Sequence, residues 1–167
     1  MIRLPLVGVA ALERLVRELV PLLARGDVVL LEGPVGAGKT TLVAAAARTL
    51  GVDAAVGSPT YTIAHRYETA DGGSISHVDL YRSRDDPEAA AADLEPYLDA
   101  GRAFIEWPTQ ALASLLEGRS CWTLQLDHAG PAARTIGIGP PARVTTAEAI
   151  ALAGRLLAAT TSEPASS

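Results

Sequence analysis

The spacing of apolar positions predicts an amphipathic helix near the start of the chain. Leu12, Leu15 and Leu19 recur at helical intervals, and charged residues fill the positions between them. Proline cannot donate a hydrogen bond to the preceding turn, so this helix is expected to kink or end near Pro21. The following segment, Val28–Glu32, is apolar throughout, which indicates a strand covered on both faces.

The remaining pattern predicts alternating helices and strands. Residues 63–68 and Ser74–Asp79 flank the turn sequence 70–73, which is typical of a β-hairpin. Further helices are predicted at residues 40–50, 87–93, 109–116 and 146–159, and further strands at residues 54–56, 103–106, 121–127 and 135–138. A hairpin within an otherwise alternating pattern predicts an α/β fold whose central sheet mixes parallel and antiparallel strands.

Composition and charge narrow the classes of protein. We expect residues 1–159 of the 167 to form a single domain and residues 160–167 a flexible tail. A net charge of −5 argues against a broad nucleic-acid-binding surface, so no DNA partner is expected. The single cysteine, Cys121, argues against a disulfide framework or a cysteine-based zinc site. The sequence shows neither a long apolar run nor a signal-peptide pattern, so we expect a cytoplasmic protein that does not bind membranes.

The candidate chemistry is concentrated in the glycine-rich stretch that follows Val28–Glu32. Gly33, Gly38, Lys39 and Thr40 match the pattern G-x-x-x-x-G-K-[ST], the phosphate-binding P-loop. Lys39 is the only lysine in the chain, and arginine serves at the other basic positions. Glycines allow backbone N–H groups to surround an anion, the lysine contacts phosphates, and the threonine hydroxyl ligates Mg²⁺. The residues expected to bind the nucleotide are Gly33, Gly36, Ala37, Gly38, Lys39, Thr40 and Thr41.

Carboxylates at strand ends are the next candidates. Asp79 ends the strand Ser74–Asp79, and Glu106 ends the strand predicted at 103–106. Ligands of open α/β sheets gather at the carboxyl ends of strands, so either residue is a candidate to complete a magnesium site. Residues 58–62 are rich in hydroxyl groups, which leaves two interpretations: a loop that senses the γ-phosphate, or an ordinary turn. Trp107 and Trp122 are interpreted as packing residues.

The order of these segments resembles the TsaE family of bacterial P-loop ATPases. The P-loop is followed by S-P-T-Y-T at 58–62, then H-V-D-L-Y-R at 77–82, then I-E-W-P at 105–108. The resemblance implies a P-loop NTPase-like three-layer sandwich with a mixed central sheet. It also implies slow hydrolysis of ATP with Mg²⁺ and work with the partner proteins TsaD and TsaB in threonylcarbamoyladenosine modification of tRNA, which is contacted indirectly.

The resemblance also implies roles for individual residues. Lys39 would hold the phosphates and act in catalysis, Thr40 would ligate Mg²⁺ directly, and Glu106 would be the second magnesium residue. Asp79 would be the catalytic acid, Thr60 would lie in the switch-like loop and contribute to catalysis, and Arg134 would lie near the nucleotide.

The residues themselves are also compatible with two other classes of function. Many small-molecule kinases share the loop pattern, although a compact hairpin in the middle of this chain leaves little room for a lid. A non-catalytic module whose shape responds to nucleotide is the other class. A GTPase is disfavoured, because guanine recognition usually needs a second lysine in an N-K-x-D motif.

Overall fold

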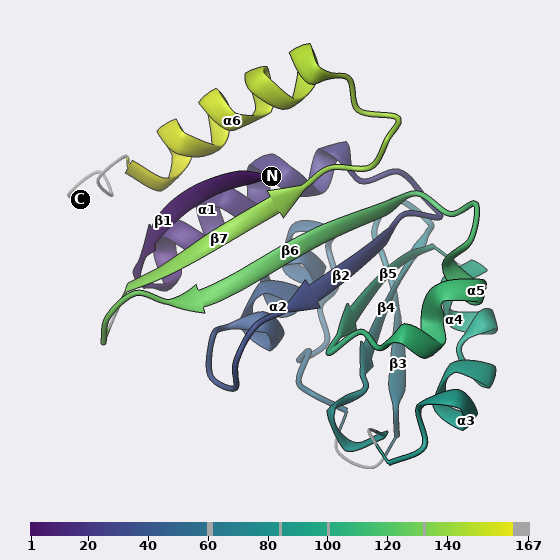
Figure 1. Ribbon diagram of the computed structural model, residues 1–167. Coiled ribbons are helices and arrows are strands. Elements are labelled where there is room, and N and C mark those ends of the chain that lie inside the picture. The colour runs from purple at the N-terminus through teal and green to yellow at the C-terminus, as the bar shows by residue number, and fades with distance from the viewer. Residues whose placement is uncertain (60–61, 84, 100, 132, 162–167) are drawn as a thin grey trace.

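A single seven-stranded sheet organises the molecule in the computed structural model (Figure 1). The structure describes residues 1–59, 62–83, 85–99, 101–131 and 133–161. The strands are β1 (Ile2–Val7), β2 (Val28–Glu32), β3 (Ala64–Glu68), β4 (Ser74–Asp79), β5 (Arg102–Glu106), β6 (Cys121–His128) and β7 (Ala133–Gly139).

The strand order β1-β7-β6-β2-β5-β4-β3 places β2 inside the sheet. Strands β6, β2, β5 and β4 run parallel, while β7 and β1 at one edge and β3 at the other are antiparallel to their neighbours. The parallel strands end at the same edge of the sheet, so the residues that follow β2, β4 and β5 come together there. The predicted mixed sheet is confirmed.

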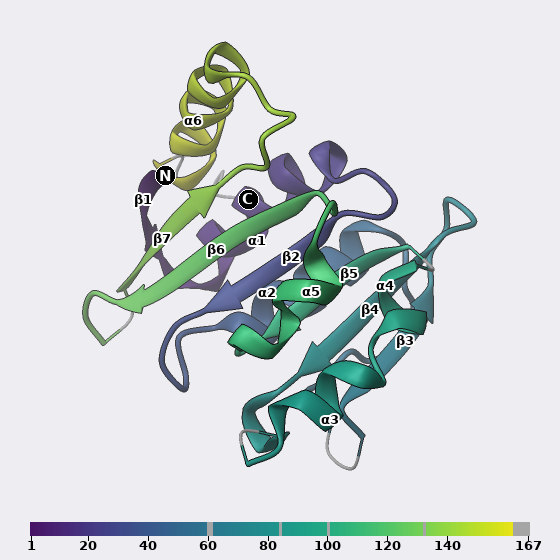
Figure 2. The same ribbon diagram turned by 45° about the vertical axis from the view of Figure 1, so that its right-hand side comes forward.

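Helices cover both faces of the sheet. One apolar core joins it to α1 (Gly8–Leu19), α2 (Lys39–Thr49) and α6 (Thr146–Thr161). A second core joins its opposite face to α3 (Pro87–Ala92), α4 (Glu95–Asp99) and α5 (Ala113–Leu116). Figure 2 shows the two sets of helices on opposite sides of the strands. The short 3-10 turns are η1 (Val20–Leu22), η2 (Tyr81–Ser83) and η3 (Gln110–Leu112). The fold is therefore the expected P-loop NTPase-like three-layer sandwich.

Successive side chains of β2 pack alternately into the two cores. Val29 and Leu31 belong to the core beneath α1 and α2, whereas Val28 belongs to the core beneath α3 to α5. Successive side chains of a strand point to opposite faces, so a strand between two helical layers must be apolar at every position. The continuous apolar run of Val28–Glu32 is the sequence signature of this placement.

Most predicted elements are confirmed, with differences at the start of the chain. Helix α1 begins at Gly8, ahead of Leu12, and changes to a 3-10 turn around Pro21 as expected. Strand β1 has no counterpart among the predicted elements. It is an edge strand, a position that tolerates the proline at residue 5, and that proline weakens its signal in the sequence.

Other differences lie further along the chain. The strand predicted at residues 54–56 is wrong, because this segment forms neither helix nor strand and joins no sheet. Helix α4 was not predicted, and Pro96 at its second position obscures the pattern. Helix α6 runs on to Thr161, while residues 162–167 of the predicted tail lie outside the described residues. The single-domain boundary stays a prediction. Within the described residues, no helix is long and apolar enough to cross a membrane.

Candidate functional site

The glycine-rich stretch forms a tight loop between β2 and α2, the position that the pattern predicted. Gly38 precedes α2 with a φ of 105°, and Gly36 has a φ of 75°. Gly33 has a φ of 133°, and a Cβ there would lie 2.0 Å from the backbone oxygen of Leu126 on β6. Side chains rarely adopt these angles, and at Gly33 none fits the space. The loop therefore depends on its glycines.

Lys39 is the first residue of α2, and its side chain turns back over the loop. Its Nζ donates hydrogen bonds to the carbonyl oxygens of Gly33, at 2.8 Å, and Pro34, at 2.9 Å. The same nitrogen lies 3.8 Å from the centroid of the Trp107 ring. Lys39 is only 4% exposed, so its charge acts where water screens it weakly.

Thr40 links the start of α2 to the end of β5. Its Oγ1 donates a 2.7 Å hydrogen bond to Oε1 of Glu106, a carboxylate that is 3% exposed. A hydroxyl has one proton and two lone pairs, so this bond leaves the oxygen of Thr40 able to coordinate a cation. Oε1 of Glu106 also lies 2.9 Å from Nε2 of His77 on β4.

Asp79 lies beside Glu106 because β4 and β5 are parallel neighbours. The sheet register pairs the two residues directly, so both side chains leave the same edge of the sheet on the α2 side. The two carboxylate oxygens of Asp79 have different partners. Oδ2 accepts a 2.6 Å hydrogen bond from the hydroxyl of Ser58, and Oδ1 accepts one of 3.0 Å from the backbone N–H of Tyr81.

Ser58 belongs to the hydroxyl-rich segment 58–62, which the sequence left open as a switch-like loop or an ordinary turn. Its bond to Asp79 brings the beginning of that segment to the site. Thr60, the residue singled out there for catalysis, lies outside the described residues.

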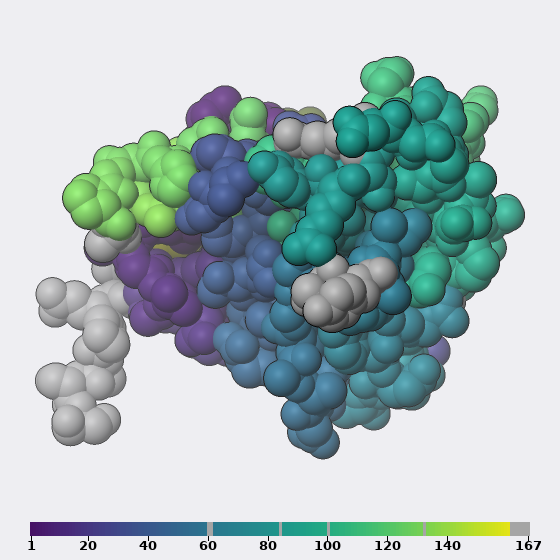
Figure 3. Space-filling model, turned by 90° about the horizontal axis from the view of Figure 1, so that it is seen from below, coloured from purple at the N-terminus to yellow at the C-terminus, as the bar shows by residue number. Residues whose placement is uncertain are grey.

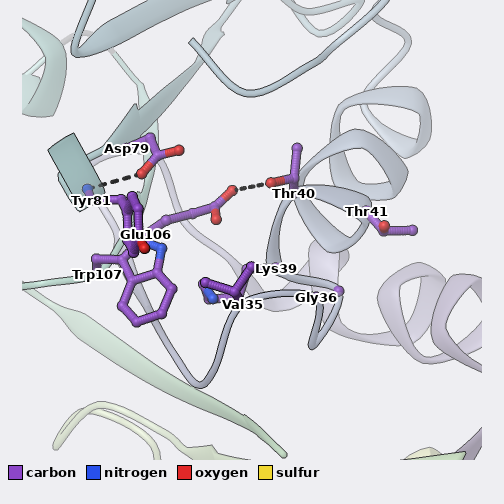
Figure 4. A pocket seen from close by; sticks show the side chains of 10 residues that line it. Val35, Gly36, Lys39, Thr40, Thr41, Asp79, Tyr81, Glu106 and Trp107 are labelled. Carbon is purple, nitrogen blue, oxygen red and sulfur yellow. Dashed lines mark hydrogen bonds between the residues drawn. The ribbon is translucent and has the colours of Figure 1, made fainter. Parts of the chain in front are cut away.

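A cavity of about 340 Å³ opens where these residues meet (Figure 4). Figure 4 shows Thr40 and Glu106 pointing toward each other across it, with Lys39 and the Trp107 ring alongside. Seen from below, the loop lies between the β6–β7 connection, in green, and the residues after β4, in teal (Figure 3). The lining residues are Val35, Gly36, Gly38, Lys39, Thr40, Thr41, Asp79, Tyr81, Glu106 and Trp107.

A second, smaller cavity of about 150 Å³ shares three lining residues with the first, Gly36 and Gly38 of the loop and Thr41 of α2. Ala37 and Arg134 also line it, together with apolar residues from β1, α1 and β6. Arg134 donates from Nη2 to the carbonyl oxygen of Gly36, at 3.3 Å. Of the predicted residues, Gly36, Gly38, Lys39, Thr40, Thr41 and the two carboxylates line the first cavity. Ala37 lines only the second cavity and Gly33 lines neither of the two, while Arg134 reaches the loop from the second.

Sequence reasoning missed the contribution of Trp107. Its ring packs partly against the core, as interpreted, but it also lines the cavity and lies 5.1 Å from the ring of Tyr81, centroid to centroid. Its φ of 59° is uncommon for a residue other than glycine and stores backbone strain. The sequence signal that could have indicated this role is the position of Trp107 directly after Glu106, at the end of a strand. Trp122, by contrast, is a buried packing residue, as interpreted.

The oxygen ligands at the site suit a hard cation. The described residues contain no group of three or more His, Cys, Asp or Glu side chains placed to hold a metal ion. Thr40 and Glu106 instead offer a hydroxyl and a carboxylate beside a loop with the P-loop pattern. Mg²⁺ is commonly bound in this way, by few protein oxygens together with water and substrate phosphates.

Comparisons with known proteins identify the family of this chain. Residues 7–136 match the model of the family described as threonylcarbamoyl adenosine biosynthesis protein TsaE. The protein of this description from Streptomyces coelicolor is 40% identical over 115 residues, which cover 68% of this chain and 76% of that protein. The Aquifex aeolicus protein is 41% identical over 96 residues, covering 56% and 67% of the two chains. A crystal structure of YdiB from Bacillus subtilis superposes with a TM-score of 0.67 at 25% identity, covering 91% of this chain and 93% of that one. The chain belongs to the TsaE family.

Proposed function

We propose that this protein is an ATPase that binds Mg²⁺ and ATP in the 340 Å³ cavity, hydrolyses ATP slowly, and so supports a TsaD–TsaB complex in threonylcarbamoyladenosine modification of tRNA. The observation that carries the proposal is the convergence of Lys39, Thr40, Glu106 and Asp79 on one cavity beside the glycine-rich loop. The family membership supplies the pathway.

The loop provides the phosphate-binding part. Backbone N–H groups at the start of α2 and the partial positive charge of the helix N-terminus attract an anion. The ammonium of Lys39 donates to two carbonyl oxygens of its own loop, and these bonds hold the charge against the loop backbone. A bound phosphate chain would form a direct ionic contact with this ammonium.

Thr40 and Glu106 would hold Mg²⁺, and their chemistry fits this ion. The hydroxyl of Thr40 gives its proton to Glu106 and keeps its lone pairs for the cation. When bound, Mg²⁺ neutralises charge on the phosphate oxygens and so eases attack at the terminal phosphorus.

Asp79 would position the attacking water and accept its proton. The hydrogen bonds from Ser58 and Tyr81 fix the carboxylate, one on each oxygen. A carboxylate has about four acceptor positions, so capacity remains for a water molecule. A general base of this kind typically contributes about 100-fold or more to the rate.

The second cavity would receive the adenosine end of the nucleotide. It adjoins the phosphate loop and is lined largely by apolar residues such as Val9 and Leu12, as expected for a site that binds a flat, largely apolar base.

A measurement of ATP hydrolysis by the full chain, with and without TsaD, TsaB and tRNA, tests the proposal. We expect slow turnover by the chain alone and strong stimulation by the complete set of partners. Lys39→Ala should abolish both activities. Arg48→Ala, which changes a basic residue at the far end of the same helix and removes a surface ion pair with Glu13, should preserve them.

Other results would contradict the proposal. Transfer of phosphate to a small metabolite without the partners would favour a kinase. Nucleotide binding without hydrolysis under any combination of partners would favour a non-catalytic module. The isolated chain should also bind tRNA weakly, because its net charge of −5 opposes association with phosphates.

A further inference from the structure

A buried histidine lies against the carboxylate of Glu106. His77 is 0% exposed and Glu106 is 3% exposed, and Nε2 of the imidazole is 2.9 Å from Oε1 of the carboxylate. The two side chains come from neighbouring parallel strands, β4 and β5, and lie on the face covered by α2. His77 is also two residues before Asp79, so a single strand supplies both groups.

We propose that His77 is a positioning residue for Glu106, holding this carboxylate in the orientation that serves the nucleotide site. The inference rests on the proposed function, since it assigns a role toward bound Mg²⁺. The terminal torsion of a glutamate is broad, so a single hydrogen bond orients the carboxylate poorly. Two donors act on Oε1, Thr40 from the helix and His77 from the sheet, and together they restrict it.

The environment of the ring argues against a role in packing alone. Nδ1 of His77 is buried and has no hydrogen-bond partner among the residues that the structure describes. Burying an imidazole costs free energy that an aliphatic side chain of similar size would avoid. Within the described residues, the polar contact of the ring is the one to Glu106. A neutral ring with its proton on Nε2 satisfies that contact and leaves Nδ1 with a lone pair rather than an unsatisfied N–H.

Histidines or carboxylates that hold metal-coordinating side chains commonly affect metal affinity, and their loss typically weakens it by about 10-fold to 100-fold. Glu106 is the last residue of β5, and its backbone pairs with Leu31 on β2 and with Asp79 on β4. Its backbone is therefore fixed, and the freedom that remains for His77 to restrict lies in the glutamate side chain. His77 lies two residues inside β4, where ladder hydrogen bonds fix the backbone. The rigid interior of the sheet thereby orients a residue at its edge.

The chain offers a matched control. His65 on β3 lies directly opposite His77 in the sheet register, but the side-chain contacts found for it within the described residues are with Tyr67. Substitutions at His65 therefore test the loss of a histidine from the same sheet without touching the proposed contact.

Nucleotide affinity provides the first test, measured with ADP and a non-hydrolysable ATP analogue, with and without Mg²⁺. We expect His77→Leu to reduce the gain in affinity that Mg²⁺ brings by about 10-fold or more, with affinity in the absence of Mg²⁺ unchanged. His77→Gln retains a donor at a similar position and should recover most of that gain. His65→Leu should behave as wild type. Equal losses in the His77→Leu and His77→Gln proteins would overturn the proposal.

Nitrogen-15 NMR of the imidazole rings in the nucleotide-free protein provides the second test. We expect the ring proton of His77 to be on Nε2. In the wild-type protein this proton should exchange slowly with solvent, and in Glu106→Ala it should exchange rapidly. A proton on Nδ1 would overturn the proposal even if His77→Leu failed to fold. If wild type showed no effect of Mg²⁺ on nucleotide binding, the proposed function would fail, while the NMR result would still decide whether His77 orients Glu106.

Discussion

The ammonium of Lys39 lies over the indole of Trp107, with 3.8 Å between Nζ and the ring centroid. This contact joins the first residue of α2 to the residue that follows β5, and Trp107 makes it from a strained backbone with a φ of 59°. A cation over an aromatic face contributes about 0.5–2 kcal/mol, comparable to the cost of such a backbone conformation. The cation–π contact and the backbone conformation of Trp107 are linked, so a change at Lys39 should alter the environment of the indole.

Trp107 should therefore report nucleotide binding through its fluorescence. We expect ATP to change the tryptophan emission of wild type and of Trp122→Phe, but not of Trp107→Phe. Trp122 is fully buried and donates to Asp27 at a distance of 2.9 Å, so its surroundings stay constant. A titration of each variant with ATP, read at the emission maximum, measures the effect. A full response from Trp107→Phe would show that the indole does not sense the site.

Replacement of Lys39 should weaken ATP binding even when positive charge is kept. Hydrogen bonds to charged groups contribute about 1.5–3 kcal/mol each, so Lys39→Ala should lower affinity about 10-fold to 150-fold. Lys39→Arg should not restore it, because a planar guanidinium does not fit a position that is 4% exposed and lies against the Trp107 ring. Calorimetric titration with ATP measures both losses, and Arg48→Ala is the control. Wild-type affinity in Lys39→Ala would refute the assignment of the phosphate-binding lysine.

The loop and its flanking elements could be predicted because their signals are local. A continuous apolar run predicted β2, and the glycines and the lysine after it predicted a turn into a helix. Asp79 and Glu106 could be placed near the loop from the rule that parallel strands end at one edge of a sheet. Each inference needed only the residues of one segment and a general property of parallel sheets.

The rest depends on contacts between distant segments. The second cavity forms where β1 and α1 meet β6 and β7, and the sequence does not indicate that β1 pairs with β7. The positive φ of Trp107 arises where the chain leaves β5 under the hydrogen bond from its N–H to the carbonyl of Leu31. His77 could be assigned to the sheet, but its contact with Glu106 follows from the register between β4 and β5. No local pattern specifies these relationships.

Asp79→Asn should reduce turnover while leaving nucleotide affinity within about twofold of wild type. The asparagine oxygen can accept from the N–H of Tyr81, and its amide can donate to the hydroxyl of Ser58, so the local structure should survive. The variant loses the capacity to accept a proton, and we expect kcat to fall about 100-fold or more. Single-turnover hydrolysis with a parallel measurement of ATP affinity separates the two effects. Equal losses in both would make Asp79 a binding residue.

The second cavity should affect binding of the nucleoside but not of the phosphates. Val9 lines this cavity and is 57% exposed, so Val9→Asp is expected to fold while placing a charge beside the bound base. ATP affinity should fall by about 10-fold, whereas inorganic triphosphate should compete as in wild type. Val7→Asp changes a neighbouring valine that is 69% exposed and does not line the cavity, and it serves as the control. Equal weakening of ATP and triphosphate would place the base elsewhere.

Asp71 in the β3–β4 turn should make stability depend on pH in the acid range. The hydrogen bond from the hydroxyl of Thr69, then that from the N–H of Gly73, and further the contact with Arg102 lower the pKa of Asp71 from 3.8 to about 2. A carboxyl group whose pKa is lower in the folded state stabilises that state above its unfolded pKa. This stabilisation is lost as the pH falls from about 4 toward 2.

Asp71→Asn should therefore lower the unfolding temperature by a constant amount between pH 7 and pH 5, and the gap to wild type should close as the pH falls toward 2. Thermal unfolding across this range, with Asp99→Asn at an exposed ion pair as control, measures the gap. Carbon-13 NMR titration of the carboxyl group checks the cause. Thr69→Ala should raise the pKa of Asp71 more than Arg102→Leu, because the Thr69 hydrogen bond is the larger influence. A gap that persists unchanged at pH 2 would show that Asp71 acts through its shape and not its charge.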